Sequence, residues 1–371
     1  MFLSSDEEDL IIGSSTKLLK INVNTKSISS INISENIDKI EVKNPLPLKI
    51  NCLDFKDKHL AVCTNTKNLL LYDPQLKLLN KWLTNRSPSQ LCFVNTIEII
   101  LADKTGDVYV YKRNEPKPIL LLGHLSMILD VKLSLCGKYV LTGDRDEKIR
   151  VSCFPNAYNI KSYCLGHEEF VTIIKVLDSK TILTASGDGT IRFWNFIDGE
   201  EIYQINCNNH ITDKKKIDSF SSEMRLVNVN TNSLPITNIS IRIVNECEMH
   251  IAVTLHESND LLIFNVKRND SNFQSNKLQT LIIPNTKMLY FFKDKLIVFI
   301  NCKISIYSFD TKTNCYNEIQ SNLSNLIQDN IEFENNCDDK DDNITLLFKK
   351  SFDNLQDYQE RKKLRIDDTN R

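Results

Sequence analysis

Glycine is scarce in this sequence. Only nine of its 371 residues are glycine, and a single G-x-G spacing occurs, at Gly187 and Gly189. A nucleotide-binding βαβ unit needs a glycine-rich turn between a strand and the helix that follows it. Gly187 and Gly189 lie between two β-prone runs instead, with no strand-to-helix alternation around them. The sequence therefore argues against a nucleotide-binding domain, and we expect no bound cofactor.

Closely spaced metal ligands are also missing. The eleven cysteines never come nearer than 11 residues to one another, and the sequence contains no H-x-x-x-H or E-x-x-H pair. These spacings exclude paired C-x-x-C zinc or redox motifs. Most of the cysteines lie in apolar runs, which is typical of reduced core residues in an intracellular protein. We expect no metal site and no reactive thiol.

The chain lacks both an excess of one charge and a long apolar run. It has 46 basic and 48 acidic residues, a formal net charge of -2, so no overall field attracts nucleic acid or an anionic membrane. One of the most apolar stretches, residues 289–300, is interrupted by Lys293, Asp294 and Lys295. The first residues carry no basic segment followed by an apolar core, so we expect a soluble protein without a secretory signal.

A repeated pattern occupies residues 123–194. A Gly-His pair, an apolar alternating run, a turn with Asp and a short β-prone run occur twice in the same order. The Gly-His pairs begin at Gly123 and Gly166, 43 residues apart, and the two final runs begin at Ile149 and Ile191, 42 residues apart. This period matches the roughly 40 to 45 residues of a WD-repeat blade.

Runs equivalent to the one at Ile191 recur along the chain. They begin at Leu18, Leu69, Val108, Ile149, Ile191, Leu261 and Ile304. Each follows another β-rich run and a short polar turn, as expected of strands joined by hairpins. The sequence therefore predicts an all-β protein, a seven-bladed β-propeller in residues 1–350, followed by a charged tail at 351–371.

The ends of the chain and two long intervals need separate interpretations. Residues 9–12 come so early that the first blade has no evident innermost strand, so we predict that a C-terminal strand at 343–348 completes it and closes the ring. Residues 206–235 and 311–342 are polar or Asn-rich, and we predict exposed loops there. The run Lys214-Lys215-Lys216 could contact RNA phosphates, although such runs are more often simply solvated.

The second copy of the repeat has the polar residues of a WD blade. His167, Ser186, Asp188 and Trp194 stand where an imidazole, a hydroxyl, a carboxylate and an indole N–H form one buried hydrogen-bonded set. A Ser-His-Asp catalytic triad is the alternative interpretation. However, Ser186 lies in no G-x-S-x-G motif, and the blade pattern explains all three residues. We assign these residues a structural role and predict no catalytic residues.

The first copy departs from this pattern. It retains His124 and Asp146 but has Asp144 in the serine position and Ser152 in the tryptophan position, which predicts an incomplete network. Its turn carries charges of both signs over residues 144–150. Such a turn can be merely solvated, because exposed ion pairs contribute only about 0 to 1 kcal/mol. It also suits a docking surface, where complementary charges select a partner and fix its orientation.

Several motifs resemble one family. The segments are ADKTGDVYVY at 102–111, LGHLSMILDV at 122–131, GDRDEKIRVSCFP at 143–155 and CLGHEEFV at 164–171, with FDNLQDYQERKKLR at 352–365 in the tail. Together they are similar to the WD-repeat, non-catalytic subunit of tRNA (guanine-N7)-methyltransferase. The resemblance implies a nuclear propeller that binds a separate, S-adenosylmethionine-dependent catalytic subunit and supports methylation of a guanine in the tRNA variable region.

The same resemblance implies which residues meet the partner. Charged residues of the turn contact the catalytic subunit in this family, and the matching positions here are Arg145, Glu147, Lys148 and Arg150. The family binds tRNA mainly through the catalytic subunit, which agrees with the nearly neutral charge of this chain. Two other functions stay open from the residues alone, namely a scaffold in another complex and an intrinsic enzyme. Copurification and methylation by the isolated chain distinguish them.

Overall fold

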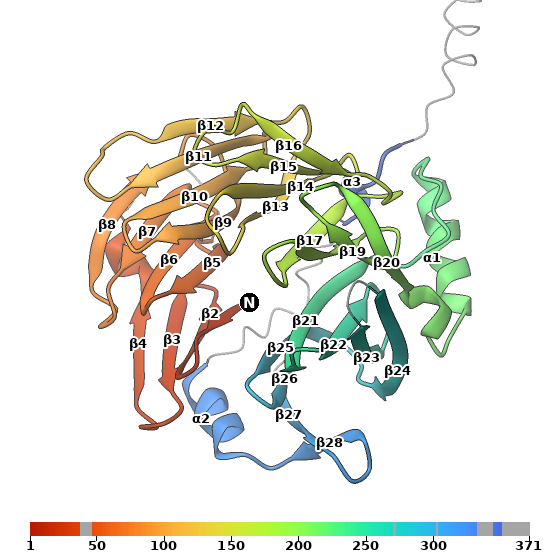
Figure 1. The fold of residues 1–371 in the computed structure, drawn as a ribbon. Helices are drawn as coiled ribbons and strands as arrows, with labels where there is room; N and C mark the ends of the chain where they lie inside the picture. Colours follow the sequence, from red (N-terminus) through yellow and green to blue (C-terminus); the bar gives the residue numbers. More distant parts are fainter. Residues whose placement is uncertain (38–46, 270–271, 302, 332–343, 351–371) are drawn as a thin grey trace, which may run out of the picture.

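The protein forms a ring of seven antiparallel sheets (Figure 1). This architecture comes from a computed structural model that describes residues 1–37, 47–269, 272–301, 303–331 and 344–350. Each sheet has four strands in chain order, with the first strand nearest the centre of the ring and the fourth on its rim. The prediction of a seven-bladed β-propeller is confirmed, and the sheets are numbered here as blades 1 to 7.

Each blade is one contiguous stretch of chain. Blades 1 and 2 comprise β1 (Phe2–Ser5), β2 (Asp9–Ser14), β3 (Lys17–Asn22), β4 (Ile28–Asn32), β5 (Ile50–Lys56), β6 (His59–Thr64), β7 (Asn68–Tyr72) and β8 (Leu78–Leu83). Blades 3 and 4 comprise β9 (Pro88–Asn95), β10 (Glu98–Asp103), β11 (Asp107–Lys112), β12 (Ile119–Gly123), β13 (Ile128–Leu133), β14 (Tyr139–Asp144), β15 (Ile149–Cys153) and β16 (Ile160–Cys164). Blades 5 to 7 comprise β17 (Val171–Val176), β18 (Thr181–Ser186), β19 (Thr190–Asn195), β20 (Glu200–Asn206), β21 (Ile236–Asn245), β22 (Glu248–Leu255), β23 (Asp260–Asn269), β24 (Asn272–Ile282), β25 (Thr286–Phe292), β26 (Lys295–Ile300), β27 (Lys303–Asp310) and β28 (Cys315–Ile319).

The short helical segments all lie outside the sheets. They are the 3-10 turns η1 (Ile33–Asn36) and η2 (Cys207–His210) and the helices α1 (Lys215–Leu226), α2 (Asn322–Asn330) and α3 (Ile344–Leu347). None of the helices in the described ranges is long and apolar enough to cross a bilayer.

Burial within a blade follows the position of the strand. In blade 5 every residue of β18 is buried, whereas most of β20 is exposed or half-buried. The middle strands pack against the neighbouring blades on both faces, so they read as nearly continuous apolar runs. The seven runs found in the sequence are the third strands of the blades, since they coincide with β3, β7, β11, β15, β19, β23 and β27.

Polar side chains join the innermost strands of neighbouring blades. Asp130 on β13 accepts a hydrogen bond from the backbone N–H of Ile174 on β17, with 2.7 Å between N and Oδ2. Ser240 on β21 accepts one from Phe291 on β25 at 2.8 Å. These contacts satisfy backbone donors that the ladder within each blade leaves unpaired. They also hold adjacent blades in a fixed relative position.

The predicted C-terminal closing strand is wrong. Residues Phe2–Ser5 supply the innermost strand of blade 1, pairing with β2 through a turn in which the Asp6 carboxylate accepts from the N–H groups of Glu8 and Asp9. Residues 344–347 form α3 instead of a strand. Asn343 lies outside the described residues.

The ring closes by side-chain packing between blades 1 and 7. The hydroxyl groups of Ser5 and Tyr290 are 2.9 Å apart, and apolar residues of both blades form one cluster. Helix α2 covers this seam with Leu323 and Ile327, and Ile331, the residue after the helix, joins the same cluster (Figure 1).

The two predicted loops contain ordered structure. Residues 206–235 form η2 and α1, and α1 buries Phe220 and Met224 against blades 5 and 6. The described part of residues 311–342 forms β28 and α2. The lysine run is also tied to the ring, because Lys214 donates to the Asn208 carbonyl and Lys216 donates to the Glu257 carbonyl at 2.7 Å. Residues 332–342 and the predicted tail at 351–371 lie outside the described ranges.

Candidate protein-docking site

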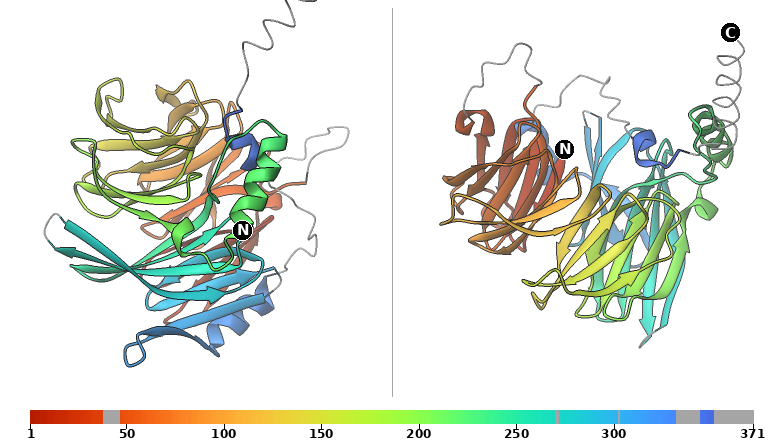
Figure 2. Two further views of the ribbon diagram at one scale, coloured as in Figure 1. Left: turned by 90° about the vertical axis from the view of Figure 1, so that its right-hand side faces the viewer. Right: turned by 90° about the horizontal axis from the view of Figure 1, so that it is seen from above.

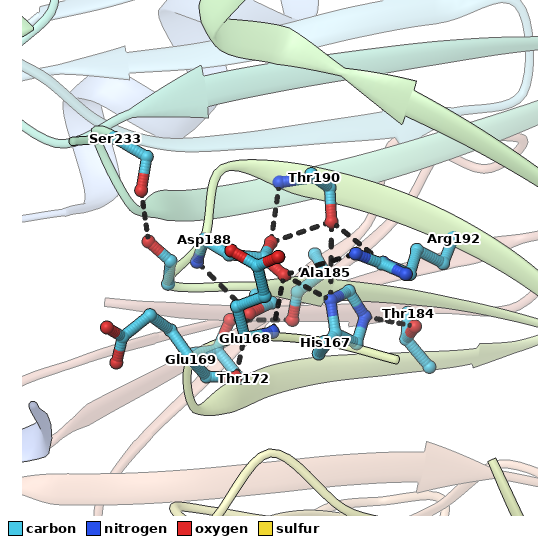
Figure 3. Close-up of polar contacts among 12 residues, drawn as sticks. His167, Glu168, Glu169, Thr172, Thr184, Ala185, Asp188, Thr190, Arg192 and Ser233 are labelled. Atoms are coloured by element: carbon cyan, nitrogen blue, oxygen red, sulfur yellow. Dashed lines mark hydrogen bonds and ion pairs between the residues drawn. The ribbon is translucent and has the colours of Figure 1, made fainter. Parts of the chain in front are cut away.

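The blade with the second copy of the repeat contains a buried chain of hydrogen bonds (Figure 3). His167 contacts Asp188 through Nδ1 at 2.9 Å and Thr184 through Nε2 at 2.7 Å, and the Trp194 indole N–H donates to the same Thr184 hydroxyl at 2.8 Å. An indole N–H can only donate, so the Thr184 hydroxyl donates onward to Nε2, and the Nδ1–H of His167 faces Asp188. The four side chains satisfy one another.

The predicted network is correct for three residues and wrong for the hydroxyl. Thr184 stands where Ser186 was expected. Ser186 donates instead to the Glu169 carbonyl at 2.9 Å and accepts from the Asp188 N–H at 3.1 Å. It therefore shapes the turn before β19 and makes no hydrogen bond with His167 or Trp194. A serine that donates to a backbone carbonyl, away from the imidazole, also lacks the geometry of a catalytic triad.

Asp188 is held in its charged form. Burial opposes its ionisation, but hydrogen bonds from His167, Thr190 and the Glu168 N–H outweigh burial and lower the pKa of Asp188 to about 2. The Thr190 hydroxyl donates to Asp188 Oδ1 at 2.7 Å. The Arg192 guanidinium lies 3.8 Å from Asp188 Oδ2, the oxygen that contacts His167. Every acceptor of this group is occupied inside the blade, so it serves as scaffold.

The first copy has a more complete network than the sequence predicts. His124 contacts Asp144 through Nδ1 at 3.0 Å and Thr142 through Nε2 at 2.8 Å. Asp144 thus takes the part that Asp188 plays in the second copy. Only the tryptophan is missing, because the buried Ser152 stands in its place and accepts from Arg150 Nε at 2.9 Å.

Asp144 Oδ1, the carboxylate oxygen that does not contact His124, forms hydrogen bonds with the backbone of the charged turn. It accepts from the backbone N–H groups of Asp146 and Lys148 at 2.9 and 3.0 Å. Between them Glu147 adopts a left-handed backbone conformation, with φ of 69°. Such a φ is uncommon for a residue other than glycine. The buried Asp144 carboxylate therefore fixes the turn from below, while the side chains of residues 145–148 point away from the blade core.

The four residues predicted to meet a partner differ in how far their own chain engages them. Arg150 donates to the carbonyls of Gly123 and Ala157 at 3.2 and 3.0 Å, so it connects β15 to the end of β12 in blade 3 and to the loop after its own strand. Arg145 and Glu147 have partners described below. Lys148 is exposed, and its ammonium group has no hydrogen bond or ion pair with any residue in the described ranges.

Residues 344–349, here called the C-terminal strap, lie on this turn. Arg145 Nε donates to the Leu347 carbonyl at 3.2 Å, and Lys349 forms an ion pair with Glu147 at 2.6 Å. Phe348 is 1% exposed and packs edge-on against Phe170, with 5.0 Å between ring centroids. Figures 1 and 2 show α3 beside α1 at this edge of the ring. Sequence reasoning missed the strap because it assigned residues 343–348 to a strand.

The exposed leucines near the turn complete the surface. Leu125 is fully exposed and lies between Gly123 and Met127, whose carbonyls bond Arg150 and Arg145. Leu165 is 62% exposed and follows the end of β16, and Leu346 of the strap is 59% exposed. Apolar side chains beside charges of both signs are typical of protein–protein interfaces. The described residues contain no group of three or more His, Cys, Asp or Glu that could hold a metal ion.

Solved structures support the fold. The β-propeller domain of Cps50 (Swd1) from Myceliophteria thermophila matches with a TM-score of 0.60 and 11% identity, covering 85% of this chain and 94% of that one. The WD40 repeats of RRP9 match with a TM-score of 0.59 and 14% identity, covering 80% of this chain and 84% of that one. At these identities the likeness concerns the fold alone.

Sequence comparisons are more specific. The family model described as the tRNA methyltransferase TRM82 WD40 domain matches residues 111–298. The non-catalytic subunit wuho of tRNA (guanine-N7)-methyltransferase from Aedes aegypti is 31% identical over 337 residues, covering 83% of this chain and 76% of that protein. The corresponding subunit wdr4 from Danio rerio is 39% identical over 175 residues, covering 45% and 41%. The chain belongs to the family of non-catalytic subunits of tRNA (guanine-N7)-methyltransferase.

Proposed function

We propose that this chain binds and stabilises the separate catalytic subunit of a tRNA (guanine-N7)-methyltransferase, and that N7-methylguanosine formation in the tRNA variable region depends on it. Family membership supports this proposal, because the relatives are named as non-catalytic subunits of that enzyme. The scarcity of glycine and the absence of a nucleotide-binding βαβ pattern are consistent with methyl transfer by another chain. The two chains form a heterodimer.

The Asp144–Arg150 turn is the proposed docking surface. The observation that carries this assignment is the exposed Lys148 on a turn fixed by the buried Asp144, with Leu125 and Leu165 beside it. A cation next to apolar groups fits a partner surface with a carboxylate flanked by apolar side chains. Arg145, Glu147 and Arg150 belong to the same surface, and their internal hydrogen bonds also keep it in shape.

The tRNA contacts are proposed to lie mainly on the catalytic subunit. The chain has a net charge of -2, and two lysines of the 214–216 run donate to backbone carbonyls of the ring. Neither the overall charge nor this lysine run therefore favours strong binding to a phosphate backbone. We further propose nuclear localisation, which imaging of a tagged protein in cells tests directly.

Lys148→Glu tests the docking surface. We expect this variant to bind the catalytic subunit at least about tenfold more weakly, because it places a carboxylate where the partner offers one. Arg150 is a poor choice for the same test, since its reversal also removes two hydrogen bonds to backbone carbonyls. Lys104→Glu is the control: it is exposed and lies in the equivalent turn of blade 3, where its backbone N–H donates to the Ser87 carbonyl as that of Arg145 donates to the Met127 carbonyl.

Two measurements complete the test. Copurification and calorimetry give the affinity, and a tRNA methylation assay of the catalytic subunit with and without this chain gives the functional consequence. Wild-type affinity for Lys148→Glu would show that the docking surface is elsewhere on the ring. Failure of the wild-type chain to copurify with the catalytic subunit would reject the proposed function and favour a scaffold in another complex.

A further inference from the structure

We propose that the C-terminal strap holds the Asp144–Arg150 turn in the conformation that binds the catalytic subunit, with Lys349 as a positioning residue for Glu147. The turn and the strap then form one composite docking surface. This inference rests on the proposed function, because it concerns how the same surface is kept ready for its partner.

The strap is firmly attached to the ring at one point. Phe348 is almost completely buried between Phe170, which precedes β17, and Phe220 of α1, with ring centroids 5.0 and 6.1 Å away. A buried aromatic side chain of this size dominates the packing of a short segment. The insertion that carries α1 therefore acquires a role: it provides one wall of the pocket for Phe348.

Two contacts then connect the attached strap to the turn. The Leu347 carbonyl accepts from Arg145 Nε on one side of Phe348, and Lys349 pairs with Glu147 on the other. The Lys349 ammonium also lies 3.9 Å from Asp146, so it bridges two carboxylates of the turn. The hydrogen bond to Glu147 raises the pKa of Lys349, so the lysine stays charged at neutral pH.

The turn needs such support because of its backbone. Glu147 has a φ of 69°, a conformation that disfavours residues with a Cβ and persists only where neighbouring contacts enforce it. The Asp144 carboxylate enforces it from inside the blade. Lys349 acts on the Glu147 side chain from outside, and together they leave Lys148 pointing outward.

The strap also changes the chemistry that the partner meets. Arg145 and Glu147 are occupied within the chain, whereas the Lys148 ammonium has no partner among the residues that the structure describes, and the strap adds the exposed Leu346. A strap that instead blocked the surface would have to leave when the partner binds. Its departure would expose Phe348 and strip an aromatic neighbour from both Phe170 and Phe220, so a holding role is favoured over a competing one.

Hydrogen exchange and affinity measurements on four full-length variants test the proposal. In Lys349→Met we expect the amides of Asp146 and Lys148 to exchange about three to ten times faster in the free chain, and affinity for the catalytic subunit to fall by a similar factor. Lys349→Arg keeps the ion pair, so its amide exchange rates and its affinity for the catalytic subunit should stay at the wild-type values. Glu147→Gln should weaken binding like Lys349→Met, and the double variant should be no weaker than either single one.

The outcomes separate the possible failures. Unchanged exchange and affinity in Lys349→Met would overturn the proposal, and tighter binding would show that the strap competes with the partner. Additive losses in the double variant would mean that Glu147 contacts the partner independently of Lys349. If the wild-type chain does not bind the catalytic subunit, the proposed function and the docking role of the strap both fail. The exchange measurement would still show whether Lys349 orders the turn.

Discussion

Thr184→Val is the sharpest test of the buried network. The Thr184 hydroxyl accepts from Trp194 Nε1 at 2.8 Å and donates to His167 Nε2 at 2.7 Å, and all three residues are at most 5% exposed. Valine has nearly the same shape but satisfies neither group. An unsatisfied buried polar group costs about 1 to 3 kcal/mol, so losing both contacts should destabilise the protein by about 3 kcal/mol.

Two controls come from the chain itself. Thr142→Val removes the equivalent hydroxyl in blade 4, where Ser152 replaces the tryptophan, so only His124 loses a strong partner and the expected cost is about 1.5 kcal/mol. Ser186→Ala should cost about 1 kcal/mol, since it removes the hydrogen bond to the Glu169 carbonyl and the longer one from the Asp188 N–H. Measured in a Trp194→Phe background, which has no indole N–H to leave unsatisfied, Thr184→Val should cost less, about 1.5 kcal/mol.

Urea unfolding followed by tryptophan fluorescence and circular dichroism measures these differences. The urea midpoint should decrease least for Ser186→Ala, more for Thr142→Val and most for Thr184→Val, while the dependence of the unfolding free energy on urea concentration stays unchanged. If Thr184→Val were as stable as the wild type, or if Ser186→Ala were the most damaging substitution, the assignment of the hydroxyl would be wrong.

Two further predictions concern stability elsewhere in the ring. Burial, reinforced by the charge of Arg242, lowers the pKa of His250 to about 4, so the unfolded chain binds the additional proton below its own pKa near 6.5. Stability should therefore fall by about 2 kcal/mol between pH 7 and pH 5, and urea unfolding should show a smaller difference for His250→Asn. Gly189→Ala should destabilise by at least about 2 kcal/mol, because its φ is 72° and a Cβ would lie 1.8 Å from Asn208 Nδ2. Gly137→Ala, at φ 69° with nothing within 4 Å of the Cβ, should cost only about 1 kcal/mol in the same thermal or urea assay.

The repeat architecture was predictable because it depends on local patterns. Apolar alternation and short polar turns recur along the chain, four of the six intervals between third strands are 39 to 43 residues, and each third strand is long enough to be recognised. The choice between Thr184 and Ser186 was not predictable in the same way. They are two residues apart on a fully buried strand, so alternation places both on one face, and only the three-dimensional position of the imidazole distinguishes them.

The other errors have equally specific causes. Strand β1 has only four residues, too few for a clear alternation. Helix α1 does contain an apolar face, with Ile217, Phe220 and Met224 at spacings of three and four, but the charged residues around it conceal that face. The position of the strap depends on the Phe348 pocket, which residues far apart in the sequence build together.

Aligning the two copies of the repeat shows how the two turns differ. The register of β13 with β14 and of β17 with β18 equates Arg145 with Gly187 and Glu147 with Gly189. In the second copy a Cβ at Gly187 would lie 2.6 Å from the Phe170 ring, so no side chain fits there. The first copy has Arg145 at that position.

The backbone makes the contrast sharper. Glu147 and Gly189 share a left-handed conformation, with φ of 69° and 72°, although glycine adopts it at lower cost. In the first copy His124 is bound by Asp144, which stands two positions before the residue that aligns with Asp188. The aligned residue, Asp146, does not bind the histidine and faces outward toward Lys349. Blade stability alone would favour glycine at 147. The chain instead keeps charged side chains on a turn whose buried carboxylate already satisfies the blade, which is the expected arrangement if those side chains serve a contact outside it.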